Sequence, residues 1–268
     1  MEIREHWRYD GAMRSLFLTA GLLLAGCSHT SASTPPPSSE TSFSAQAIVD
    51  APDRTEADRA LDAGRHPAAL LEFVGVRPGM KVAELVAGAG YTTELLARAV
   101  GPEGVVYGEN PKFVLDLFAE KPWSERLALP VNQKVVRVDR ELNEPLPPEV
   151  TDLDAVVSNI IYHDVVSLQA DRAKMNAAIF RALKPGGVYV VVDSSAKPGT
   201  GVADTQTLHR IDEQVVRSEV EASGFQLAAE SDVWRNPQDA RDWNASPQAA
   251  GARRGTSDRF ALKFVKPR

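Results

Sequence analysis

Cysteine is nearly absent from this chain, since Cys27 is the only one among 268 residues. A single cysteine excludes a disulfide within the chain and a metal site built from several thiolates. The five histidines are scattered, and none falls in an H-E-x-x-H pattern. The sequence therefore predicts no metal site.

Long apolar runs and clusters of basic residues are also missing. The apolar stretch from Leu16 to Ala25 is far shorter than the roughly 20 residues that a transmembrane helix needs. The 36 acidic and 30 basic residues give a net charge of −6, without a run rich in Lys or Arg. Because nucleic-acid binding requires clustered positive charge, neither DNA nor RNA is expected as a partner.

The N-terminal segment resembles a bacterial export signal. Arg14 precedes the apolar stretch, and Met13 is an alternative start that would leave a short, basic first region. Leu24-Ala25-Gly26-Cys27 resembles the lipobox of bacterial lipoproteins, in which cleavage precedes a cysteine that is then acylated. The resemblance implies lipidation of Cys27 and a membrane anchor made of acyl chains. The alternative is a cytosolic protein with a misassigned start codon and one incidental cysteine.

Three regions follow from this reading. Residues 1–26 are expected to be a lipoprotein signal peptide, and residues 27–49 a tether rich in Ser, Thr and Pro that buries too little apolar surface to fold. Residues 50–268 are expected to form the folded domain. The expected location is the periplasmic side of a membrane, and Ser28 directly after the cysteine favours the outer membrane over the inner one.

Residues 50–268 alternate between strand-like and helix-like segments. Short, valine-rich apolar runs predict seven strands, at Lys81–Leu85, Val105–Tyr107, Val135–Val138, Leu153–Ser158, Val188–Asp193, Phe225–Ala229 and Phe260–Val265. Helices are predicted at Ala51–Ala63, Pro67–Val74, Thr92–Val100, Pro111–Phe118, Leu168–Leu183 and Thr205–Ser223. Apolar strands that alternate with amphipathic helices indicate a mainly parallel sheet with both faces covered.

Acidic residues stand at the ends of the first five predicted strands. They are Glu84, Glu109, Asp139, Asp164 and Asp193. The carboxyl ends of parallel strands meet at one edge of the sheet, where ligands bind in open α/β folds. A row of carboxylates there predicts a ligand that carries positive charge and sugar hydroxyls, and it disfavours a pyrophosphate. Each acid by itself is as readily explained as the end of a strand or the cap of a helix.

The turn after the first predicted strand, "AELVAGAGY", contains Gly88 and Gly90 in a G-x-G pattern. Glycine there lets the backbone approach a ligand, although many α/β folds use it only for close packing of helix against strand. No G-x-x-x-x-G-K-[ST] motif occurs, so a phosphate-binding P-loop is excluded.

These motifs together resemble the class I S-adenosyl-L-methionine (SAM) dependent methyltransferases. The resemblance rests on "VAELVAGAG", "VVYGENP", "VVRVD", "LDAVVSN" and "LKPGGVYVVVD" and covers about residues 67–267. The segments "NIIYHDV", "HRIDEQVV", "SDVWRNPQD" and "SDRFALKFVKP" are similar to a narrower group of exported bacterial methyltransferases. The resemblance implies a Rossmann-like three-layer α/β/α sandwich with a seven-stranded, mostly parallel sheet whose last strand is antiparallel.

The resemblance also implies a cofactor site. SAM would bind with Glu84, Gly88 and Gly90 at its methionine end, Glu109 at the ribose and Asp139 at the adenine. One residue departs from the family pattern of acid-x-Gly-x-Gly-x-Gly, because Val86 stands at the first glycine. A β-branched residue resists positive φ, so we expect this turn to take another shape.

The candidates for catalysis follow the fourth predicted strand. They are Tyr162, His163 and Asp164, and His163 can titrate near neutral pH and act as a base toward a methyl acceptor. A histidine at a strand-to-helix junction can equally serve only as a cap. Charged residues before the first predicted strand, Arg54, Asp58, Asp62, Arg65 and His66, are candidates for a lid or for a solvated helix face.

Two functions remain open at this point. The first is a SAM-dependent methyltransferase that acts on a small-molecule or envelope substrate. The second is a non-catalytic ligand-binding protein on the same scaffold in the cell envelope. Val86 and the export signal favour the second, because SAM is made in the cytoplasm. The ordered acids and Tyr162-His163-Asp164 favour the first, which is the prediction that we carry forward.

Overall fold

The computed structural model describes residues 43–268, which lie within one compact unit. The predicted signal peptide and Cys27 fall outside the described residues. Helix α1 (Ala45–Val49) belongs to the stretch expected to be tether, yet Ala45 and Val49 are buried against α3 (Pro67–Val74) and its neighbours. The folded region therefore begins before Asp50. Among the described residues, no helix is both long and apolar enough to cross a membrane.

The predicted seven-stranded sheet is confirmed. Its strands are β1 (Lys81–Leu85), β2 (Val105–Asn110), β3 (Val135–Asp139), β4 (Leu153–Asn159), β5 (Leu183–Ser194), β6 (Gln226–Glu230) and β7 (Arg259–Val265). The order across the sheet is β3-β2-β1-β4-β5-β7-β6. Strands β1 to β5 are mutually parallel, and β7 runs antiparallel to both β5 and β6.

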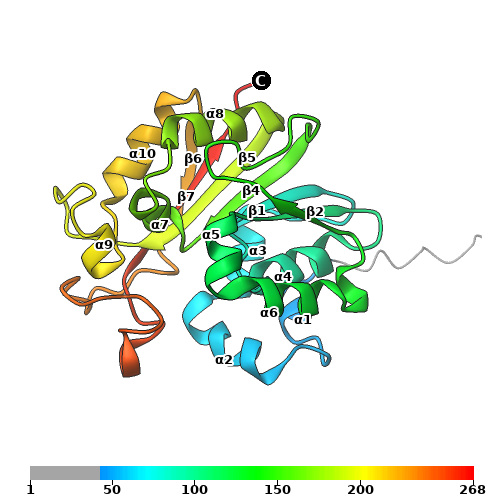
Figure 1. The fold of residues 1–268 in the computed structure, drawn as a ribbon, viewed down its shortest axis with the longest axis horizontal. Helices are drawn as coiled ribbons and strands as arrows, with labels where there is room; N and C mark the ends of the chain where they lie inside the picture. The colour runs from blue at the N-terminus through cyan, green and yellow to red at the C-terminus, as the bar shows by residue number, and fades with distance from the viewer. Residues whose placement is uncertain (1–42) are drawn as a thin grey trace, which may run out of the picture. The chain divides into compact units, whose positions relative to one another are not determined.

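Helices cover both faces of this sheet, as the alternating pattern requires (Figure 1). The central strands carry apolar side chains to both sides: in β5, Tyr189 and Val191 pack in one core, and Val190 and Val192 pack in the other. The first core lies under α8 (Arg172–Ala182) and α10 (Glu213–Ala222), and the second lies under α1, α3 and α4 (Tyr91–Val100). The fold is the predicted three-layer sandwich.

The prediction of one continuous helix over Thr205–Ser223 is wrong, because the chain leaves the helix in the middle of this segment. The chain forms α9 (Thr205–Leu208), leaves the helix at His209 with φ 49°, and begins α10 at Glu213 with Asp212 as the N-cap. The break is made by long-range contacts, because the fully buried Arg210 donates to Asp239 at 2.8 Å and to the carbonyl of Ser195 at 3.0 Å. These tertiary contacts override the local apolar stripe that predicted one helix.

Two other predicted helices differ in extent. Leu168 ends α7 (Tyr162–Ser167), and α8 starts only at Arg172, so the helix expected over residues 168–183 begins late. The helix expected over residues 111–118 continues instead as α5 (Lys112–Val114), a π-helical turn η1 (Leu115–Ala119) and α6 (Glu120–Leu127). A π-turn inside a helix often marks a functional region.

Candidate functional site

The turn between β1 and α4 is left-handed at three positions. Val86, Gly88 and Gly90 have φ of 51°, 57° and 81°. The expectation that Val86 would force another shape is wrong, because Val86 takes the positive φ that glycine would take. The turn therefore keeps its glycine-like path at a strain of about 1–2 kcal/mol.

Two side chains at the end of β2 hold this turn in place. A carboxylate oxygen of Glu109 accepts from the backbone N–H of Val86 at 3.0 Å. The side chain of Asn110 accepts from the N–H of Gly88 at 2.7 Å and donates to its carbonyl at 3.1 Å. Strand β2 thus fixes the turn through side chains, and the sequence motif "GEN" gives no hint of the part played by Asn110.

The two glycines of the turn have different reasons to be glycine. A Cβ at Gly90 would lie 2.5 Å from the buried ring of Trp123, so packing alone requires glycine there. A Cβ at Gly88 would meet only the ring of Phe118, at 3.9 Å. Packing therefore does not explain glycine at position 88, whose contact with the cofactor stays a prediction, whereas Gly90 is explained by the fold.

Both acids next to the turn are buried and hold their protons tightly. Glu84 accepts from the hydroxyl of Thr93, and burial raises its pKa to about 7. Burial also raises the pKa of Glu109 well above its usual value, although the bond from Val86 opposes this. The second carboxylate oxygen of Glu109 is buried without a hydrogen-bond partner in the described structure. Such an acceptor lacks the donor that a ligand hydroxyl would supply.

Asp139 lies farther out, at the end of β3. It is exposed and pairs with Arg137 at 2.8 Å, and Arg137 in turn binds Glu120 at 2.6 Å. Asp139 borders a polar cavity of about 630 Å³ between α5–η1 and the segment that follows β3. A cavity of this size suits a small ligand.

The predicted row of five free carboxylates is only partly present. Asp139 is neutralised by Arg137, and the fully buried Asp193 binds His163 at 2.7 Å. Asp164 is partly exposed beside two histidines. Glu84 and Glu109 alone face the glycine turn, and burial favours their neutral forms. The edge of the sheet is thus not a strong negative field, and that part of the electrostatic argument is wrong.

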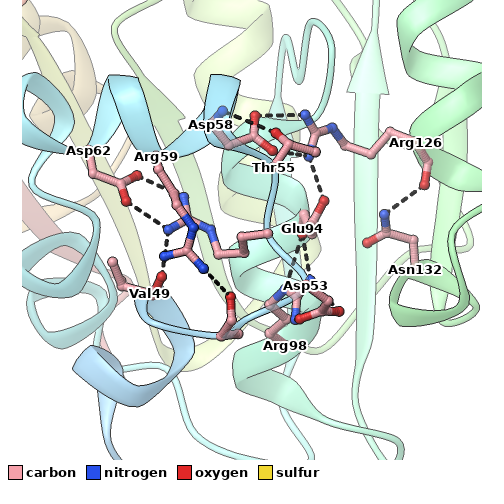
Figure 2. Close-up of polar contacts among 12 residues, drawn as sticks. Val49, Asp53, Thr55, Asp58, Arg59, Asp62, Glu94, Arg98, Arg126 and Asn132 are labelled. Carbon is pink, nitrogen blue, oxygen red and sulfur yellow. Dashed lines mark hydrogen bonds and ion pairs between the residues drawn. The ribbon is translucent and has the colours of Figure 1, made fainter.

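Helix α2 (Glu56–Arg65) is pinned over the start of α4, so its charged residues do not form a solvated face. Figure 2 shows Arg126 of α6 bridging Asp58 of α2, at 2.8 Å, and Glu94 of α4, at 2.5 Å. Arg126 also donates to the carbonyl of Ala89 in the glycine turn at 2.6 Å, and the hydroxyl of Tyr91 donates to Asp62 of α2 at 2.6 Å. One network therefore joins α2, the turn and α6, and a lid role for α2 stays a prediction.

The structure separates Tyr162 from His163 and Asp164, the other two predicted catalytic residues, whose Nε2 and Oδ1 atoms lie 3.4 Å apart. Tyr162 is fully buried, donates its hydroxyl to Glu219 at 3.0 Å and accepts from Asn176 at 3.0 Å. These contacts are part of the packing between α7, α8 and α10. The hydroxyl of Tyr162 is thus committed to the core, which is a structural role in place of the predicted catalytic one.

His163 is held at two points by Asp193 at the end of β5. Asp193 accepts from the backbone N–H of His163 at 2.8 Å and binds its Nδ1 at 2.7 Å. Burial opposes protonation of the imidazole, but the charge of Asp193, its hydrogen bond and the charge of Asp164 together outweigh burial and raise the pKa of His163 above its ordinary value. With the Nδ1 proton on the Asp193 side, Nε2 keeps a free electron pair.

His209, which the sequence analysis missed, faces that electron pair. Its Nδ1 lies 3.3 Å from Nε2 of His163, and Asp164 Oδ1 lies 3.4 Å from the same nitrogen. The expectation of scattered histidines is therefore wrong for this pair. The signal that could have revealed it is "DEQ" at Asp212, a helix N-cap inside the segment predicted as one continuous helix.

Comparison with known proteins finds similarity in the part of the chain around the glycine turn. Residues 38–119 match the family model of protein-L-isoaspartate(D-aspartate) O-methyltransferase (PCMT). That range includes α1 to α4, β1, β2 and the turn that joins β1 to α4. His163 and His209 lie outside it.

Solved structures match over most of the chain. A SAM-dependent methyltransferase from Aquifex aeolicus is similar with TM-score 0.56 and 16% identity, over 84% of this chain and 99% of that one. The glycopeptide N-methyltransferase MtfA, complexed with sinefungin, matches with TM-score 0.53 and 18% identity over 77% and 87%. The cyclase SpnF matches with TM-score 0.53 and 17% identity over 79% and 81%. At these identities the likeness establishes the methyltransferase fold. Together with the family model it supports the prediction of an enzyme that transfers methyl groups from SAM.

Proposed function

We propose that this chain is a SAM-dependent methyltransferase whose acceptor binds against His163. The observation that carries the proposal is the unpartnered carboxylate oxygen of Glu109, buried beside the glycine turn of a methyltransferase fold. A ribose hydroxyl would supply the missing donor. Glu84, whose pKa is raised to about 7 by burial, would gain a cationic partner from the amino group of the cofactor.

The remaining cofactor contacts follow from the same turn. Gly88 leaves open space beside its Cα, and Asp139 borders the cavity of about 630 Å³ in which the adenine would lie. When bound, SAM supplies an electrophilic methyl group, so the protein needs mainly to align a nucleophile with it and to exclude water. Helix α2, fixed over the turn through Arg126, is placed to exclude water from the site.

The acceptor side of the site is built by His163 and Asp193. In the metal-free protein, Nε2 of His163 has the electron pair to take a proton from a hydroxyl, amine or thiol acceptor. Asp193 is a positioning residue, because it fixes the imidazole and stabilises its protonated form. An isoaspartyl acceptor is not carried over from the family match, since this side of the site lies outside residues 38–119. The acceptor we propose is a small molecule or an envelope component.

The alternative is a ligand-binding protein without catalysis on the same scaffold. Two observations favour it: the N–H groups of Val86 and Gly88 are already occupied by β2 side chains, and a cyclase shares the fold. Transfer of labelled methyl from SAM to an envelope extract, lost in His163→Gln, would support the enzyme. Binding of SAM without transfer to any extract fraction would support the alternative.

Titration of the full chain with SAM by calorimetry tests the cofactor assignment. Glu109→Gln weakens the proposed bond to the ribose, and a hydrogen bond to a neutral carboxyl is worth about 0.5–1.5 kcal/mol, so affinity should fall about two- to tenfold. The exposed Glu103→Gln is the matched control and should bind like the wild type. The absence of heat at millimolar SAM would contradict the proposal, and an unchanged Kd in Glu109→Gln would show that the ribose is held elsewhere.

We also propose that Cys27 anchors the protein to a membrane on its periplasmic side, the outer membrane by preference. The support is the lipobox-like sequence alone. Labelled palmitate should enter the wild-type chain and not Cys27→Ser. Equal labelling of the two chains would refute lipidation at this residue.

A further inference from the structure

Three side-chain atoms meet beside α7 and α9 at nearly equal separations. Nε2 of His163 lies 3.3 Å from Nδ1 of His209 and 3.4 Å from Oδ1 of Asp164. The third side of the triangle, from His209 Nδ1 to Asp164 Oδ1, is 3.5 Å. A tetrahedral zinc ion with bonds of about 2.0–2.1 Å holds its ligand atoms about 3.3–3.4 Å apart. The triangle has the dimensions of one face of such a site.

Two of these atoms, Nε2 of His163 and Oδ1 of Asp164, are acceptors that face each other. Asp193 binds the Nδ1 side of His163, so Nε2 presents an electron pair, and Asp164 presents a carboxylate to the same spot. Two acceptors that face each other require a cation between them or a proton on one of them. The separations of 3.3–3.5 Å are long for hydrogen bonds, but they fit a shared cation.

The surroundings hold the two histidines in place. Asp193 is fully buried and also accepts from the backbone N–H groups of His163 and Ser194, which fixes the orientation of the ring. A carboxylate on the far nitrogen of a histidine is the usual support of a metal ligand, since it sets the tautomer and raises basicity. His209 is fixed by its left-handed backbone and by the buried Arg210 that follows it.

We propose that His163, His209 and Asp164 bind a divalent transition metal, for which zinc has the fitting geometry. Two imidazoles and one carboxylate favour zinc over magnesium or calcium, which prefer oxygen ligands. The side chains of Asp164 and His209 are 39% and 33% exposed, so the fourth position opens toward solvent on their side. Three protein ligands and one open position are the arrangement of a catalytic zinc site.

The metal would change the chemistry of the proposed acceptor site. A bound metal uses the electron pair of Nε2, so His163 no longer acts as a base. The hydroxyl or thiol of an acceptor at the fourth position would instead lose its proton because the metal lowers its pKa. Metal binding itself does not depend on the proposed methyl transfer, and it can be measured without SAM.

The test is calorimetric titration of the chelator-treated, tag-free full chain with Zn²⁺ in the absence of SAM. We expect one site per chain with micromolar or tighter affinity, weakened at least tenfold in His209→Ala and in Asp164→Asn. The side chain of Asp164 is 39% exposed, and its ion-pair contacts within residues 43–268 are with the two histidines, so its isosteric variant should fold. His66→Asn is the matched control, since His66 also has a left-handed backbone but lies outside the triangle.

Cobalt gives a second readout of the same site. Co²⁺ bound to the wild type should show the intense visible absorption of four-coordinate cobalt, and Asp164→Asn should weaken it. The proposal is overturned if no stoichiometric Zn²⁺ binding occurs up to about millimolar concentration, or if both variants bind like the wild type. Loss of Zn²⁺ binding with intact SAM binding would refute the metal site alone, and the converse would refute only the cofactor assignment.

Discussion

Binding of SAM should release a proton from Glu84. The carboxyl group is buried at the end of β1 and its pKa is raised from 4.5 to about 7. Because one pH unit corresponds to about 1.4 kcal/mol, ionising Glu84 in the ligand-free protein costs about 3 kcal/mol more than in water. A cationic amino group beside it would recover much of that cost, so binding should lower the pKa of Glu84 and expel its proton.

The affinity for SAM should therefore depend on pH below 7. The carboxyl is mostly protonated at pH 6, so close to one proton should leave for each SAM bound, and few should leave at pH 8. Affinity should rise toward tenfold per pH unit as the pH increases to about 7 and then level off. Calorimetry at pH 6 in buffers of different ionisation enthalpy measures the proton count directly.

Glu84→Gln separates this effect from other titrating groups. The variant should release no proton at pH 6 and should bind SAM with nearly constant affinity from pH 5.5 to 7.5. Glu103→Gln, exposed and distant in sequence from the turn, should behave like the wild type. Equal proton release in Glu84→Gln and in the wild type would refute the reasoning. Glu84 should also make the free energy of unfolding depend on pH without SAM. The folded protein holds this proton more tightly than the unfolded chain does, so stability should fall as the pH rises from about 4.5 to 7.

Three further outcomes follow from the contacts described above. Asp193→Asn should lower the pKa of His163 in chelator-treated protein, since the carboxylate raises it; the imidazole signals in NMR check this, and an unchanged pKa would contradict it. Arg126→Met leaves the buried Asp58 without its guanidinium and should cost about 3–5 kcal/mol in urea unfolding, against at most about 1 for the exposed pair in Arg137→Met. Tyr162→Phe should cost about 1–3 kcal/mol of stability and leave the Kd for SAM unchanged; weaker SAM binding would restore a role for the hydroxyl in the site.

The sequence was a good guide to the sheet because each strand carries its own apolar signal. The run Lys81–Leu85 matches β1 at both ends, and the alternation of strands and helices correctly indicates a mainly parallel sheet. The sequence was a poorer guide to the ends of helices, because distant contacts decide some of them. Asp212 is a local sign of a second helix start within Thr205–Ser223, but nothing local shows that Arg210 leaves the helix to bind the distant Asp239.

The sequence likewise predicts some features of the candidate site and misses others. Glu84, Gly88 and Glu109 could be placed from their positions at strand ends, because the carboxyl ends of parallel strands share one edge. The raised pKa values of Glu84 and Glu109 could not be predicted from the sequence, because they depend on burial, which no motif reveals. The pairing of His163 with His209 was also hidden, because 46 residues separate them and the helix break brings them together.

Strained backbone accompanies the groups that form this site. Val86, Ile160 and His209 have φ of 51°, 63° and 49°, which each cost a side chain about 1–2 kcal/mol. Such strain persists only where the surroundings over-determine it. Val86 is held by Glu109 at 3.0 Å, and the N–H of Ile160 donates to the carbonyl of Val192 in β5 at 2.6 Å. The sheet thus holds two of these bends, at the glycine turn and just before α7. Three of the seven described non-glycine residues with positive φ are Val86, Ile160 and His209. Because such a backbone persists only where contacts hold it, we infer that the fold fixes these bends and that they position the groups of the proposed site.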